Sequence, residues 1–136
     1  MKLCLSSLIV LLGTTVTMVS GKCYGEGLNT DINWGGRDGQ AAARAATEYA
    51  CRDNNGNFKG HFNPGEEKTY CVSFGSSTSF VFKVKNLNTN QGFDLNDDDC
   101  ALRLQNEING CNEGGQSTFS GWWFSSDPEN YANCGN

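Results

Sequence analysis

Six cysteines are the feature that most constrains how this chain can fold. The chain has 136 residues and seven cysteines, of which Cys4 lies in an N-terminal segment that we expect to be removed. The other six are Cys23, Cys51, Cys71, Cys100, Cys111 and Cys134. An even number of cysteines in a small secreted chain predicts three disulfides, although the spacing leaves the pairing open. Among the pairings we favour Cys111 with Cys134, which would tie the end of a predicted helix to the chain terminus.

The first 21 residues have the layout of a secretory signal peptide. Lys2 supplies a basic start, residues 3–12 are almost all apolar, and residues 19–21 are small or slim at the expected cleavage position. The apolar stretch is too short to span a bilayer comfortably. We therefore expect cleavage after Gly21, an extracellular location, no membrane insertion, and one folded domain at residues 22–136.

The charge of the chain argues against nucleic acid as a partner. The formal net charge is −5 at pH 7, and the lysines are dispersed along the sequence. Such a chain lacks the basic patch that binds phosphate backbones. An aromatic content of 11% together with 17 glycines indicates a folded domain rich in turns.

Two segments predict helices. Residues 38–52 are rich in alanine, with Asp38 as the expected N-cap. Their apolar stripe is loose and consists of Ala42, Ala45, Ala46, Tyr49 and Cys51. Residues 97–109 begin with three aspartates, which suit the positive end of a helix dipole. In this second helix, one face is expected to be buried and carries Cys100, Leu104, Ile108 and Cys111.

The remaining segments predict strands. Alternating apolar residues mark residues 69–74 and 79–85, with Phe80, Phe82 and Val84 facing the core and Lys83 and Lys85 facing out. Shorter candidates are residues 23–24, 58–62 and 121–125, with turns at 63–65 and 75–77 and a strand end at 127–128. The resulting order is strand, helix, three strands, helix, strand. It predicts a single α+β domain, an α/β sandwich whose antiparallel sheet is backed by two helices and stapled by disulfides.

Catalytic arrangements are poorly supported. His61 is the only histidine, so sites that need two are excluded. The sharpest enzyme hypothesis is a small secreted ribonuclease that uses His61, Glu66 or Glu67, and Arg52. That class needs a second acid–base partner and a positive pocket, and this acidic chain offers neither. We therefore expect a protein that is not an enzyme.

Metal sites are not expected either. Residues 94–99 are acidic, but the calcium-loop pattern requires glycine and glutamate where Asp99 and Gln105 stand. Helix capping explains these aspartates without a metal. The cysteines lack a CxxC pair and belong to an oxidising compartment, which argues against zinc. We expect no metal and no cofactor.

Tryptophans among small polar residues are the strongest candidates for binding. In the loop at residues 34–39, Trp34 could stack on a sugar ring while Arg37 and Asp38 contact hydroxyl groups. Trp122 and Trp123 must point to opposite faces of a strand, so we expect one to lie in the core and the other to face away from it. The alternative is that Trp34 and the outward tryptophan merely cover the sheet.

A resemblance favours the binding interpretation. The pattern of residues 100–115, followed by residues 121–124, Asp127-Pro128 and Cys134, resembles a family of small secreted fungal proteins that includes a cytotoxic lectin from an ink-cap mushroom. The motif at 34–36, the alanine-rich helix and Tyr70-Cys71 also fit. The resemblance implies an α/β sandwich, a homodimer whose sheet continues across the interface, and glycans rich in N-acetylgalactosamine and fucose.

We therefore expect a secreted, non-catalytic fungal lectin with a cytotoxic or defensive role. Its expected partners are glycans or glycoproteins and a second copy of itself. The expected glycan-binding residues, taken from side-chain chemistry, are Trp34, Arg37, Asp38, Trp122, Trp123 and Tyr131. The alternatives are a secreted effector or toxin that binds a protein target and, third, the ribonuclease.

Overall fold

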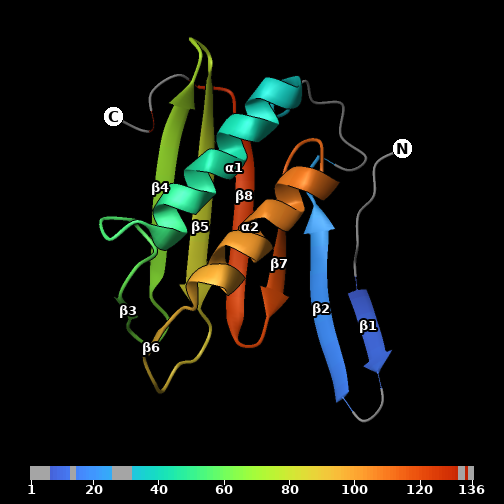
Figure 1. The fold of residues 1–136 in the computed structure, drawn as a ribbon, viewed down its shortest axis with the longest axis vertical. Coiled ribbons are helices and arrows are strands. Elements are labelled where there is room, and N and C mark those ends of the chain that lie inside the picture. Colours follow the sequence, from blue (N-terminus) through green and yellow to red (C-terminus); the bar gives the residue numbers. More distant parts are fainter. Residues whose placement is uncertain (1–6, 13–14, 26–31, 132–133, 135–136) are drawn as a thin grey trace.

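The computed structural model describes residues 7–12, 15–25, 32–131 and 134. Two helices and eight strands make up the fold (Figure 1). The helices are α1 (Gly36–Arg52) and α2 (Asp97–Gly110). The strands are β1 (Ser7–Leu12), β2 (Thr15–Cys23), β3 (His61–Phe62), β4 (Glu67–Phe74), β5 (Thr78–Asn86), β6 (Phe93–Asp94), β7 (Gly115–Phe119) and β8 (Trp122–Glu129).

One antiparallel sheet forms the scaffold, with the strand order β1-β2-β7-β8-β5-β4. A separate two-stranded sheet pairs β3 with β6. Both helices lie across the same face of the large sheet (Figure 1), and α1 packs against α2. The predicted α+β sandwich is confirmed.

Alternation along the strands separates the two faces of the large sheet. Phe80, Phe82 and Val84 of β5 and Phe124 of β8 are fully buried beneath the helices. From α2, the core receives Cys100, Leu104 and Ile108, as the helical spacing predicts. The buried face of α1 differs from the predicted stripe, because Ala45 and Tyr49 are exposed. Its buried residues are Gly39, Ala43, Ala46, Thr47, Ala50 and Cys51.

All six expected cysteines are paired, but the favoured pairing is wrong. The disulfides are Cys23–Cys111, Cys51–Cys100 and Cys71–Cys134. Cys111 caps the end of α2 beside β2, where Cys23 pairs with Gly115 of β7. The chain after β8 runs instead to β4, so Cys134 meets Cys71. The Cys23–Cys111 disulfide therefore joins the end of β2 to the end of α2, across 88 positions of sequence.

Several element boundaries differ from the prediction. Helix α1 begins at Gly36 with Gly35 as its N-cap, two residues before the predicted start at Asp38. Strand β8 continues through Pro128 to Glu129. Proline is tolerated there because β7 pairs with β8 no farther than Ser126, so this end of β8 is an edge on that side. Strands β6 and β7 were not predicted.

The N-terminal segment contributes β1 and most of β2. These strands fall within the predicted signal peptide, whose residues 1–6 and 13–14 lie outside the described part of the chain. Cleavage after Gly21 would leave Lys22 and Cys23 of β2 paired with Gln116 and Gly115. Within the described residues, neither helix has the length and apolar character needed to cross a bilayer.

Candidate functional site

Trp34 does not present a face to a ligand. It is 2% exposed, and its indole is packed edge-on against Phe80 and parallel to Phe82. Its Nε1 donates a hydrogen bond to the carbonyl oxygen of Cys111 at 2.8 Å. The expectation that Trp34 stacks on a sugar ring is therefore wrong, and the alternative, that Trp34 covers the sheet, is the correct one.

A polar hollow nevertheless lies beside Trp34. It has a volume of about 300 Å³ and is lined by Asn33, Trp34, Gly36, Gln40 and Asn112. We call it the loop pocket. Its walls carry carboxamides that can contact hydroxyl groups, although Gln40 Nε2 already donates to the carbonyl oxygen of Ile108 at 3.2 Å.

Arg37 and Asp38 are exposed in the first turn of α1 and are not among the lining residues. The structure thus separates the three predicted loop residues. Trp34 belongs to the core, whereas Arg37 and Asp38 stay in solvent.

Trp122 and Trp123 point to opposite faces of β8, as expected. Trp122 packs against the core and contacts the ring of Phe62 edge-on, with ring centroids 5.0 Å apart. Trp123 is half-buried and alternates with the core residue Phe124, so it lies on the face without helices. Its Nε1 donates to Oε1 of Gln116 at 2.8 Å, which fixes the indole against β7. Trp123 is therefore the tryptophan left over from the core.

Around Trp123, the helix-free side of three strands carries mostly polar residues, of which Ser125 is buried. We call it the outer face and define it by Lys83, Gln116, Trp123, Ser125, Asp127 and Glu129. Register places Ser125 between Lys83 of β5 and Gln116 of β7. Trp123 lies one row away, between Lys85 and Thr118. Directly opposite side chains in such a sheet are about 5 Å apart, so these groups are neighbours.

A pair of carboxyl groups gives the outer face its unusual electrostatics. Burial raises the pKa of Asp127 to about 8, and the neighbouring Glu129 adds to this through a hydrogen bond and its charge. The charge of Lys83 acts in the opposite direction. Near neutral pH, the pair therefore holds a proton, which Asp127 donates to Glu129.

Tyr24 closes the outer face on the β2 side. Its hydroxyl group lies 2.6 Å from Oγ of Ser125. Burial raises the pKa of Tyr24, and the charges of Asp127, Glu107 and Glu129 act in the same direction. The phenol therefore stays neutral and able to hydrogen-bond at physiological pH.

The C-terminal tail borders the outer face at its other end. Tyr131 is 44% exposed, and its carbonyl oxygen accepts a hydrogen bond from Ser79. Burial raises the pKa of Tyr131, with further contributions from Glu129 and Asp127, which lie near it. Cys71 is on the same side of β4, so its bond to Cys134 anchors this tail. Of the predicted residues, Trp123 thus lies on the outer face, and Tyr131 lies in the tail beyond the far end of β8.

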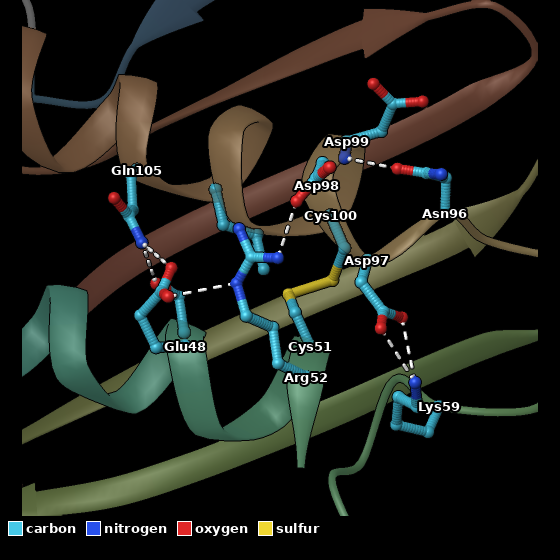
Figure 2. Close-up of a disulfide and its surroundings, with 12 residues drawn as sticks. Glu48, Cys51, Arg52, Lys59, Asn96, Asp97, Asp98, Asp99, Cys100 and Gln105 are labelled. Atoms are coloured by element: carbon cyan, nitrogen blue, oxygen red, sulfur yellow. Dashed lines mark hydrogen bonds and ion pairs between the residues drawn. A yellow bond between two sulfur atoms is a disulfide. The ribbon is translucent and has the colours of Figure 1, made fainter. Parts of the chain in front are cut away.

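The residues of the ribonuclease hypothesis are engaged in separate contacts. His61 Nδ1 lies 3.5 Å from Asp94 Oδ1, on the small sheet. Arg52 binds Glu48 at 2.9 Å and Asp98 at 2.6 Å, on the helices (Figure 2). Glu66 accepts a hydrogen bond from the backbone N–H of Asn63. No contact draws these three side chains into one site among the described residues.

The acidic segment before α2 serves the helix, as capping predicts. Asn96 is the N-cap, and its Oδ1 accepts from the backbone N–H of Asp99 at 3.1 Å. Asp97 binds Lys59 at 2.8 Å, and Asp98 binds Arg52 (Figure 2). Across the described ranges, no cluster of three or more acidic, histidine or cysteine side chains is placed to bind a metal.

Sequence reasoning missed Gln116, Ser125 and Asp127 as members of this surface. The sequence of β7 has little apolar alternation, so neither the strand nor Gln116 stood out. Comparison of the chain with known protein families finds no matching family, and comparison with curated proteins finds no match.

Proposed function

We propose that this protein is a secreted, non-catalytic fungal lectin that binds glycans on its outer face. The observation that carries the proposal is the position of Trp123. It is a half-buried indole on the helix-free side of the sheet, held in place by Gln116 and bordered by polar side chains. The resemblance described above supports glycans that contain N-acetylgalactosamine and fucose, and a cytotoxic or defensive role.

The chemistry of the outer face suits a sugar. A planar apolar ring can stack on the C–H face of a pyranose, while directional polar groups contact its hydroxyl groups. Gln116 and Lys83 are partly exposed, flank the buried Ser125 in the row beside Trp123, and can donate hydrogen bonds to hydroxyl groups. Because Trp123 is already fixed by its hydrogen bond to Gln116, little side-chain entropy is lost on binding.

The proposal includes a homodimer formed by sheet extension through an edge strand. Strands β5 and β8 are central in the sheet, so neither offers an open edge. Cleavage after Gly21 would uncover β7 at Ser117 and Thr118, since these residues pair with Gly21 and Ser20. An uncovered strand edge favours pairing with another chain. Light scattering of the secreted protein at micromolar concentration should give the mass of a dimer, and a monomer mass would contradict this part.

The test is a glycan array probed with four forms of the secreted protein. Wild type should bind, and Trp123→Ala should lose about tenfold or more in affinity, since stacking contributes about 1 kcal/mol beyond area burial. Gln116→Ala should weaken binding by a smaller factor because the indole loses its support. Arg37→Ala is the matched control, since it removes an exposed side chain in the first turn of α1, away from the outer face.

The outcomes separate the alternatives. Thermal melting of each form distinguishes lost contacts from lost folding. If Arg37→Ala, and not Trp123→Ala, weakens binding, the site is at the start of α1 and not on the outer face. If the wild type binds no glycan, the lectin proposal fails, and a protein target becomes the function to test.

A further inference from the structure

A buried carboxyl group lies between α2 and β7 without a complete set of partners. Glu107 is 4% exposed, and its Oε2 makes no hydrogen bond within the described part of the chain. Two other buried polar atoms, Oγ of Ser117 and Nε of Arg103, also make no hydrogen bond within the described part of the chain. The guanidinium group of Arg103 lies over the ring of Phe119, 3.7 Å from its centroid. Buried polar groups in folded proteins are almost always paired, so this gap requires an explanation.

The expected cleavage site lies next to this carboxyl group. A Cβ atom placed on Gly115 would be 3.1 Å from Cγ of Glu107 and 2.7 Å from the carbonyl oxygen of Lys22. Gly21 is paired with Ser117, and a Cβ atom on Gly21 would be 3.0 Å from that of Ser117. The peptide bond between Gly21 and Lys22 is therefore beside Ser117 and close to Glu107.

We propose that signal-peptide cleavage creates the missing partner, so that the α-ammonium group of Lys22 binds the carboxylate of Glu107. The inference rests on cleavage after Gly21. Hydrolysis of that bond consumes one water molecule, breaks the C–N bond, and yields a carboxylate on Gly21 and an amine on Lys22. The amine is protonated at neutral pH or below, since α-amino groups have pKa values near 8.

The new charge is chemically suited to the gap. An ammonium group has three donors, so it can bind both Oε2 of Glu107 and Oγ of Ser117. The Cys23–Cys111 disulfide holds the residue after Lys22 against the end of α2. The first residue of the mature chain is thus prevented from moving away from Glu107. The other ionisable groups near this carboxyl are Arg103 of α2 and Tyr24, which follows β2.

The pairing has a defined effect on pH dependence. In the uncleaved chain, burial raises the pKa of Glu107 to about 7, and the charge of Arg103 lowers it only in part. A carboxyl group whose folded pKa is raised makes the protein less stable as pH rises from its ordinary value of 4.5 towards 7. An adjacent ammonium group favours the charged form, so cleavage should lower this pKa and remove that loss.

The test compares the secreted protein with its selectively acetylated form. Acetylation at pH 6.5 modifies the α-amine in preference to lysine side chains, whose pKa values are higher. NMR titration of the Glu107 carboxyl should give a clearly lower pKa with the free amine than with the acetylated one. N-terminal sequencing of the secreted protein should begin at Lys22. A different first residue refutes the assumed cleavage site and overturns the proposal.

Variants provide a second measurement. In wild type, the paired α-amine should react with the acetylating reagent at least tenfold more slowly than in Glu107→Gln. The isosteric amide keeps the shape of the side chain but has no charge. Ser117→Ala should fall between the two and serves where Glu107→Gln folds poorly. Equal reaction rates in wild type and variants, or one Glu107 pKa in both forms of the wild type, would overturn the proposal.

Discussion

Removing the disulfide between the two helices should destabilise the protein by about 3–4 kcal/mol. Cys51 of α1 and Cys100 of α2 are each 1% exposed and are 49 residues apart in the chain (Figure 2). Chain-entropy reasoning gives about 4 kcal/mol for a single loop of this length. The Cys23–Cys111 bond encloses that loop and already restricts the unfolded chain, which lowers the value to about 3 kcal/mol.

Other contacts between the helices cannot replace this crosslink. The ion pair between Arg52 and Asp98 joins side chains that are 41% and 83% exposed (Figure 2). Exposed ion pairs of this kind contribute little to stability because water screens them and both side chains lose freedom. Arg52→Gln therefore serves as the matched control, since it removes the ion pairs and leaves the disulfide intact.

Urea unfolding at pH 7 followed by circular dichroism measures the effect. The double variant Cys51→Ala/Cys100→Ala should show the lower unfolding free energy together with a larger m value, because its unfolded state is less compact. Arg52→Gln should change both quantities little. A loss below about 1 kcal/mol in the double variant would refute the reasoning and show that packing alone holds the helices together.

Three further predictions follow from buried or strained positions. Trp34→Ala should cost about 3–5 kcal/mol, as measured by urea unfolding, because it empties a fully buried site; retained stability would contradict its core role. Because burial raises the pKa of Asp127, the melting temperature of the wild type should fall as pH rises from about 4 to 8. The melting temperature of Asp127→Asn should fall less over the same range. Gly114→Ala should be much more destabilising than Gly65→Ala. Both positions have positive φ, at 82° and 72°, but only at Gly114 would the new Cβ collide with backbone, at Ser126; equal melting temperatures would refute this difference.

The elements that could be predicted from the sequence are those whose signal is local. Helix α2 was placed to within one residue at its end, since the aspartates of its first turn and the spacing of Cys100, Leu104 and Ile108 all lie within the helix. Strand β5 was predicted with the correct face buried for the same reason. These patterns need no knowledge of the partner elements.

The features that could not be predicted depend on contacts distant in the chain. Trp34 is buried because Phe80 and Phe82 of β5 and the carbonyl of Cys111 surround it, and the hydrogen bond to Cys111 spans 77 residues. Its neighbouring glycines suggested an exposed loop instead. Strand β7 likewise owes its existence to pairing with β2 and β8, since its own sequence is mostly polar.

The distribution of disulfides assigns different roles to the two sides of the sheet. Cys23–Cys111 and Cys51–Cys100 both bind the helix layer, so that side is crosslinked twice and filled with buried aromatic rings. The outer face has only Cys71–Cys134, which holds the tail that bears Tyr131 beside Glu129. A ligand on the outer face would therefore contact strands that the helix layer holds in place on their other side. At its border it would contact the tail held by the Cys71–Cys134 disulfide. Because sites on rigid elements lose little freedom on binding, this arrangement favours the outer face over the loop pocket as the place where a glycan binds.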